Sequence, residues 1–194
     1  MSHKELNDLI LKNDKIAIRS VFEKHYGKMA AIASRYCKNQ TRASEAVNFG
    51  FNNYITKLQK NRNIQAINID EEFEKEFIKS CAAFVKSFSS EYYVASTVYA
   101  SGSSSKNFDL FESNEFIDFN LIDNDVLIKS LQQLVPSQRL VINLHVIDGN
   151  TLEETANIIE ASLQTVKSSL EKARYNLQKN VEKCYKTMKN EQSL

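Results

Sequence analysis

The sequence predicts an all-α protein with two helical lobes joined by a flexible acidic linker, and two observations support this. Only 4 glycines and 1 proline occur among 194 residues, well below the roughly 12% that these two residue types make up in average proteins. Sandwiches, barrels and doubly wound sheets need turn residues at regular intervals, so this scarcity argues against them. In addition, apolar residues recur every three or four positions over long stretches, which is typical of the buried face of a helix.

Residues 1–90 are predicted to form the N-terminal helical domain. Ser2 is the candidate N-cap of its first helix, and Thr41 is the candidate cap of a later helix. Apolar residues between these two caps continue at helical spacing through Gly27. A further helix is expected to begin near Glu71, because a cluster of acids there suits the positive N-terminal end of a helix dipole.

Residues 126–194 are predicted to form a second helical domain, in which turn and cap signals are dense. Pro136 follows a short helix, and Gly149 lies in an Asp-Gly-Asn turn that favours a left-handed backbone. Glu154 stands three residues after a threonine, which is the pattern of a capping box. The candidate caps of the three helices after the proline are Ser137, Thr151 and Ser162.

The segment between the two domains, residues 91–125, is predicted to be a flexible acidic linker. Residues 89–125 hold one lysine against seven acids and include the run Ser-Gly-Ser-Ser-Ser, a composition typical of flexible chain. Four phenylalanines are embedded in it. The simplest interpretation of this segment is a tether.

The charge of the whole chain, +1, conceals an uneven distribution. Residues 1–88 carry +5 (15 basic and 10 acidic residues), and residues 126–194 carry +2 (9 basic and 7 acidic). Within residues 163–189 there are seven basic and two acidic residues. Basic helical lobes joined by an acidic segment favour a nucleic-acid partner.

Several classes of protein are disfavoured by the sequence. Three widely spaced cysteines without a Cys-x-x-Cys motif argue against a disulfide framework or a zinc site. The three histidines have no partners at ligand spacing, and no glycine-rich phosphate loop is present, so we expect neither a cofactor nor an enzymatic activity. A polar N-terminus and the absence of a long apolar run predict a soluble, cytoplasmic protein without a membrane span.

Residues 151–178 have the layout of a helix-turn-helix, in which the second helix enters the DNA major groove. Four apolar residues of that helix are expected to face the core: Val166, Leu170, Ala173 and Leu177. The polar residues on its other side are the candidate DNA contacts: Gln164, Thr165, Lys167, Ser168, Lys172 and Arg174. The alternative is an ordinary solvated amphipathic helix.

The same region is similar to region 4 of small sigma-70 family factors. The resemblance rests on the runs Leu131-x-x-Leu134-x-Pro136-x-Gln138-Arg139-x-Val141, Asp148-Gly149-x-Thr151-x-x-Glu154-x-Ala156 and Thr165-Val166-Lys167-Ser168-x-Leu170-x-Lys172-Ala173-Arg174-x-x-Leu177. Within that family, the chain resembles the extracytoplasmic-function subgroup, whose members have only region 2, a linker and region 4. The resemblance implies that region 4 recognises the −35 promoter element and docks on the β flap of RNA polymerase.

The N-terminal domain resembles region 2 of the same family more loosely. Residues 43–51 stand where the family usually has Ala-Glu-Asp-Leu-Val-Gln-Glu-x-Phe, the segment that binds the polymerase β′ clamp. Two of the acids of that pattern are replaced, by Ser44 and Phe49. The resemblance implies that core binding depends on Glu45, Asn48 and Phe51.

The next helix departs further from the family, whose promoter-melting helix carries Arg, Asn, Asp and Arg. Those positions here are Ala83, Phe84, Phe88 and Glu91. Only Lys79 and Lys86 remain as candidate DNA contacts in this helix, and Ser169 replaces a usual arginine in region 4. Each lost phosphate contact weakens binding. Either the protein recognises an unusual −10 element, or a DNA-bound recruiting partner supplies the missing affinity through effective concentration.

These observations predict a sigma factor that binds RNA polymerase core and directs transcription initiation at promoter DNA, without catalytic residues of its own. Two alternatives remain open. The chain is a helix-turn-helix regulator that binds operators without polymerase, or its divergent region 2 binds an anti-sigma factor or a recruiting protein instead of DNA.

Overall fold

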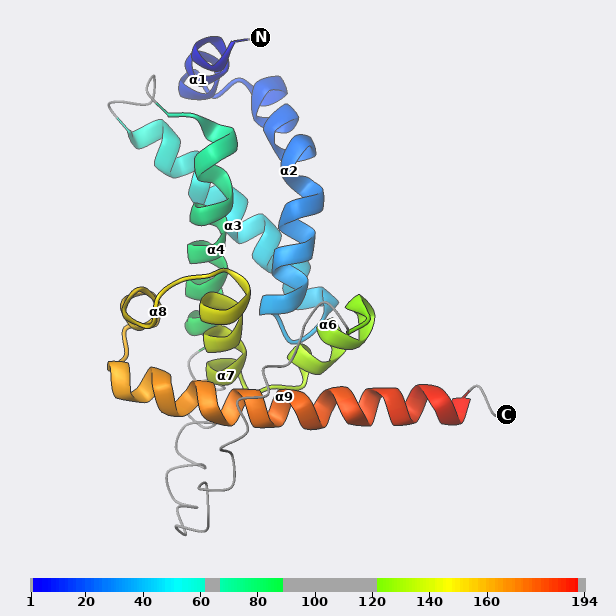
Figure 1. Ribbon diagram of the computed structural model, residues 1–194. Coiled ribbons are helices and arrows are strands. Elements are labelled where there is room, and N and C mark those ends of the chain that lie inside the picture. Colours follow the sequence, from blue (N-terminus) through cyan, green and yellow to red (C-terminus); the bar gives the residue numbers. More distant parts are fainter. Residues whose placement is uncertain (1, 62–66, 89–121, 192–194) are drawn as a thin grey trace. The chain divides into compact units, whose positions relative to one another are not determined.

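The computed structural model describes residues 2–61, 67–88 and 122–191, and the regular elements of these ranges are all helical. The chain divides into two compact units, Met1–Val85 and Lys86–Leu194, whose helices are labelled in Figure 1. The predicted all-α fold is therefore confirmed. Residues 91–121 of the predicted linker lie outside the described residues, so its flexible character stays a prediction.

The N-terminal unit contains helices α1 (His3–Leu11), α2 (Lys15–Tyr36) and α3 (Gln40–Lys60), and all but the last two residues of α4 (Ile69–Ser87). The predicted cap at Ser2 is confirmed, because Ser2 and Glu5 form a capping box. The predicted cap at Thr41 is wrong. The cap is Asn39, two residues earlier, and helix α3 begins at Gln40. Asn39 Oδ1 accepts the Arg42 N–H at 2.9 Å, because the extended backbone of Asn39 places its side chain over the first turn.

A cluster of aromatic side chains forms the core of the N-terminal unit. The ring of Phe73, on α4, stacks on the imidazole of His25 with centroids 4.3 Å apart, and the ring of Tyr54 meets it edge-on at 4.9 Å. The Phe77 ring lies 5.8 Å from that of Phe73 and is fully buried. Helices α2, α3 and α4 are thus held together by ring contacts that need close approach of their backbones.

Gly50 permits that approach at the crossing of α3 and α4. A Cβ atom added to Gly50 would lie 2.6 Å from Cε2 of the Phe77 ring, closer than real carbon atoms come. Gly27, in the middle of α2, has no atom within 4 Å of the corresponding position. Only the first of these two helical glycines is therefore required by packing.

Ion pairs join α2 to the first turns of α4. Lys24 Nζ lies 2.7 Å from Asp70 Oδ2, and Lys28 Nζ lies 3.1 Å from Glu74 Oε2. The other oxygen of Asp70 lies 3.2 Å from Nε2 of the buried His25. The lysines are largely exposed, so the free energy that these pairs contribute is small, and the buried imidazole is the group whose charge state matters.

Burial lowers the pKa of His25, and the neighbouring Asp70 only partly opposes this effect. The unfolded chain therefore binds a proton that the folded unit excludes, and the free energy of unfolding falls as the pH drops below about 6.5 through the lowered pKa. We expect His25→Phe, which keeps a ring against Phe73, to remove most of the difference between urea unfolding at pH 7.5 and at pH 5. An unchanged pH dependence in this variant would contradict the assignment.

The C-terminal unit contains α6 (Asn124–Gln132), α7 (Pro136–Val141), the π-helical turn η4 (Ile142–Ile147), α8 (Leu152–Ile159) and α9 (Leu163–Glu191). Figure 1 shows α9 as one long helix, against which α6, α7 and α8 pack. The predicted cap at Ser137 is wrong. Pro136 is the first residue of α7, and Val135 precedes it without a side-chain cap, because a proline at this position already has the helical φ and no amide to satisfy.

The segment after α7 continues as a π-helix because side-chain amides compete for its backbone groups. Asn143 is fully buried, and its Nδ2 donates to the Arg139 carbonyl at 2.8 Å. The Asp148 N–H reaches back five residues to the Asn143 carbonyl, at 2.8 Å. Asn150 then closes the turn, since its backbone N–H and its side-chain Nδ2 both donate to the Leu144 carbonyl. This widened turn sets the direction in which the chain enters α8.

Arg139 joins α7 to the end of α6. Its side chain is only 2% exposed, and Nη1 donates to the carbonyls of Gln132 at 2.9 Å and Leu134 at 3.2 Å. The last carbonyls of a helix have no partner within the helix, so a guanidinium can satisfy them. Arg139 therefore fixes the angle at which α7 leaves α6.

Candidate nucleic-acid interface and partner groove

Helix α8 begins at a fully formed N-cap. Thr151 Oγ1 accepts the Glu154 N–H at 3.0 Å, and Glu154 Oε2 accepts the Thr151 N–H at 2.8 Å. The predicted capping box is therefore confirmed. Gly149, just before it, has φ +72, so the predicted left-handed turn residue is confirmed as well. These local signals fix the start of α8 to the residue.

The turn between α8 and α9 is short and strongly hydrogen-bonded. Glu160 ends α8 in the left-handed conformation, with φ 56 and ψ 47. The Ala161 N–H donates to the Ala156 carbonyl at 3.0 Å, and Ser162 Oγ accepts the Thr165 N–H at 3.1 Å. The predicted cap at Ser162 is therefore confirmed. A short, capped connection of this kind is typical of a helix-turn-helix.

The buried side of α9 matches the sequence prediction. Val166, Ala173 and Leu177 are fully buried, and Leu170 is nearly so. The small Ala156 of α8 is also buried, and α8 packs on α9. The opposite side of α9 is therefore the side left for a ligand.

The structure brings the six predicted DNA contacts of α9 together on that side. Gln164, Thr165, Lys167 and Arg174 are exposed, and Ser168 and Lys172 are half-buried. The hydroxyl of Thr165 forms a hydrogen bond with Ser162 Oγ at 2.8 Å, so Thr165 also takes part in the cap of α9. Amide, hydroxyl and cationic groups thus alternate along one surface, as major-groove recognition requires.

The cations of this surface lie along its two edges. An α-helix turns about 100° per residue, so residues seven apart lie within about 20° of each other. Lys167 and Arg174 are seven apart and define one edge, and Lys172 lies on the other. Gln164 and Ser168 lie between the edges. Edge cations can contact phosphates on both sides of a groove, while the middle of the helix faces base edges.

The two DNA contacts predicted in α4 lie about two turns apart along that helix. Lys79 Nζ donates to Glu76 Oε1 at 3.2 Å, and Lys57 of α3 pairs with the same carboxylate. Lys86 lies in the last turn of α4. Sequence reasoning missed Lys75, which is exposed one turn before Lys79. The spacing of four residues between these two lysines indicates that they share one side of the helix. The three lysines share one stripe of α4.

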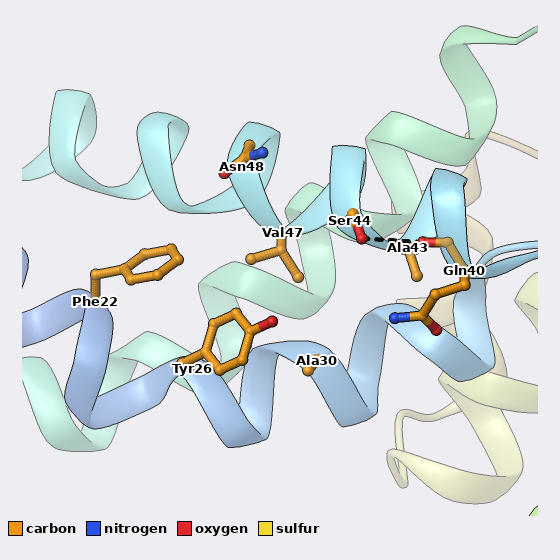
Figure 2. Close-up of a pocket in the computed structure, with 8 residues that line it drawn as sticks. All are labelled: Phe22, Tyr26, Ala30, Gln40, Ala43, Ser44, Val47 and Asn48. Carbon is orange, nitrogen blue, oxygen red and sulfur yellow. Dashed lines mark hydrogen bonds between the residues drawn. The ribbon is translucent and has the colours of Figure 1, made fainter.

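A pocket lies between α2 and α3 in the N-terminal unit, as Figure 2 shows. Its α2 wall contains Phe22 and Tyr26, whose rings lie 5.5 Å apart. Its α3 wall carries polar groups, including Ser44, whose hydroxyl donates to the Gln40 carbonyl at 3.1 Å. Eight residues line this groove, which we call the α2–α3 groove: Phe22, Tyr26, Ala30, Gln40, Ala43, Ser44, Val47 and Asn48.

The three residues predicted to bind polymerase have different positions relative to the α2–α3 groove. Asn48 is exposed and lines it. Glu45 is exposed on α3 and pairs with Arg42 at 2.7 Å. Phe51 is only 7% exposed, and its ring packs edge-on against that of Phe22, 5.0 Å away. Phe51 therefore contacts the groove only through the ring of Phe22, whereas the side chain of Asn48 is accessible to a partner.

Tyr26 is the groove residue that sequence reasoning missed. It lies on α2, 22 residues before Asn48, and is 52% exposed. An aromatic side chain half in water with a polar tip suits a protein interface. The sequence hint was that Tyr26 lies four residues after Phe22, on the same side of α2. That spacing is equally typical of core residues, and only the packing of α3 shows that Tyr26 lines a groove.

Comparison with known families identifies the C-terminal segment. Residues 125–177 match the family model described as sigma-70, region 4. No curated protein matches the chain. The sigma-70 region 4 match spans α6 to the middle of α9, so it includes the helix-turn-helix and all six predicted DNA contacts on α9.

Region 4 of sigma-70 factors is a DNA-binding helix-turn-helix domain, and the geometry of this segment agrees with that role. Its cap, turn and buried face are all formed, and its polar face is exposed. Arg139 and the π-helical turn also lie within the matched span. The α2–α3 groove and the α4 lysines lie outside it, so region 2 remains a resemblance drawn from the residues.

Among the described residues, no three histidine, cysteine or acidic side chains gather as a metal site. None of the described helices combines the length and apolar character that crossing a membrane requires. Two features of the described residues suit binding to a partner. They are the α9 surface, by which we mean the polar side of α9 with the six predicted DNA contacts, and the α2–α3 groove.

Proposed function

We propose that this chain is a sigma factor of the extracytoplasmic-function type, which binds RNA polymerase core and directs transcription initiation at promoters. The observation that carries the proposal is the formed helix-turn-helix within the region 4 match, with its polar face exposed on α9. The chemistry of initiation belongs to the polymerase, and this chain contributes recognition. As a partner of polymerase and promoter DNA, it acts in the cytoplasm.

Core binding is assigned to both units. The α2–α3 groove combines aromatic rings on α2 with amide and hydroxyl groups on α3, and it lies on the segment that resembles the clamp-binding part of region 2. We assign this groove, with Glu45 beside it, to the polymerase β′ clamp. Region 4 is assigned to the −35 element and to the β flap.

A DNA-bound recruiting partner is part of the proposal, because α4 offers few cations. Lys79 is held by Glu76, which it shares with Lys57. A lysine engaged by a carboxylate contributes less to phosphate binding than a free one, and each missing contact lowers affinity in a salt-dependent way. A partner already on DNA, or an anti-sigma factor that covers the unit, fits a weakened DNA-binding helix.

The second candidate function is a helix-turn-helix regulator that binds operators without polymerase. The region 4 match favours this second function because residues 125–177 contain the complete helix-turn-helix that would bind an operator. It assigns no role to the α2–α3 groove. Association with purified core polymerase distinguishes the two functions.

The groove assignment makes Asn48→Lys the informative variant. We expect the full chain to co-purify with core polymerase and Asn48→Lys to reduce that affinity by at least about tenfold, since a buried unpaired charge at an interface costs more than about 1.4 kcal/mol. Asn53→Lys is the matched control: it adds the same charge to an exposed asparagine on the opposite side of α3. Equal binding by both variants would reject the groove.

Transcription by core polymerase from a promoter library then tests initiation. Initiation at a shared −35 and −10 sequence by the chain alone would support an autonomous sigma factor and reject the recruiting partner. Core binding without initiation would support the recruiting partner. If the chain does not bind core at all, the sigma-factor proposal fails and the operator-binding regulator replaces it.

A further inference from the structure

Glu171 is an acidic residue in the middle of a surface that otherwise carries polar and basic groups. It lies seven residues after Gln164 and three after Ser168, so about 20° and 60° of rotation separate it from these two. Lys167 and Arg174 lie on one edge of the face, and Lys172 lies on the other. Glu171 is exposed, so its carboxylate meets whatever the α9 surface binds.

The ordinary explanation for such a residue is a helical ion pair that improves solubility. Lys167 stands four residues before Glu171, at the spacing of such pairs. Pairs of this kind do form elsewhere in the chain, as between Arg19 and Glu23 at 2.7 Å. Glu171, however, makes no ion pair or hydrogen bond with any residue that the structure describes. Its carboxylate therefore keeps its full capacity to accept hydrogen bonds from a ligand.

A carboxylate on a DNA-binding surface must avoid phosphates. At the edge of the helix it would face the backbone and be repelled, whereas in the middle it faces the floor of the major groove. The groove floor offers exocyclic amino groups as donors, and the base that glutamate suits best is cytosine, through its N4 amino group. The position of Glu171 between the cationic edges is the one that allows this contact.

We propose that Glu171 is a specificity-determining residue that selects a cytosine in the DNA site bound by α9. The inference rests on the proposed function only in that α9 must enter the major groove. The Glu171 carboxylate accepts a hydrogen bond from cytosine N4–H, while Lys167 and Arg174 hold the adjacent phosphates. No other base presents its amino group alone at that position, so the contact selects sequence as well as strengthening binding.

The test is selection of DNA sites from a randomised duplex library by the full chain at low salt, where weak phosphate contacts suffice for binding. We expect the selected sites to contain one position at which cytosine is preferred about tenfold. Glu171→Ala should abolish the preference at that position alone. Glu171→Gln should shift it toward adenine, which glutamine contacts through N6 and N7.

Two controls separate recognition from electrostatics. Glu182→Gln removes the same charge from the same face three turns further along α9 and should leave the preference unchanged. Lys167→Ala should weaken binding to all sequences equally. If Glu171→Ala instead strengthens binding to every sequence and keeps the cytosine preference, Glu171 only repels DNA and the inference fails. If the unaltered chain selects no sequence, the proposed DNA-binding function fails with it.

Discussion

Replacing Gly50 by alanine is expected to destabilise the N-terminal unit by about 2 kcal/mol, although alanine is the better helix former. The added methyl would lie 2.6 Å from the ring of Phe77. That ring is fully buried and lies beside the ring of Phe73, so it cannot move aside without displacing other rings. Overpacking of this kind costs about 1–3 kcal/mol, more than the gain in helix propensity of up to about 1 kcal/mol.

Gly27→Ala provides the matched control for this prediction. Both glycines lie inside long helices, but the Cβ position of Gly27 is open. Alanine there should stabilise the unit by about 0.5–1 kcal/mol, because it restricts the unfolded chain and favours the helix. Urea unfolding of the full chain and the two variants would measure both changes. A stabilising Gly50→Ala would show that α3 and α4 are not packed as described.

Replacing Arg139 by methionine is expected to destabilise the C-terminal unit by about 3 kcal/mol. The methionine fills much of the same space but leaves the carbonyls of Gln132 and Leu134 without the donor they have now. A buried polar group that loses its partner costs about 1–3 kcal/mol, and two such groups are affected. Thermal unfolding of the full chain, followed by circular dichroism, measures the loss.

Two further variants show whether the loss comes from the guanidinium geometry. Arg139→Lys keeps the charge but replaces a planar group that reaches two carbonyls by a single ammonium, so an intermediate loss is expected. Lys129→Met removes an exposed cation from α6 and should change stability by less than about 0.5 kcal/mol. If Arg139→Met is as stable as Lys129→Met, the guanidinium does not hold α6 and α7 together.

Local sequence signals were enough to predict the all-α fold class and the caps and turns around the polar side of α9. The capping box at Thr151, the turn at Gly149 and the cap at Ser162 are each set by residues within three positions of one another, so no distant contact is needed to predict them. The buried face of α9 follows from helical periodicity alone. Where two neighbouring residues could serve as the cap, as with Asn39 and Thr41, the sequence did not distinguish them.

Features that depend on which helices pack against each other could not be predicted from the sequence. It separates the required Gly50 from the dispensable Gly27, since only one faces a neighbouring ring. It combines Tyr26 of α2 with Asn48 of α3 in one groove, and it pairs Lys79 with a carboxylate that Lys57 also contacts. Each of these features depends on a contact between two helices. Helical periodicity describes each helix separately, so it carries no information about such contacts.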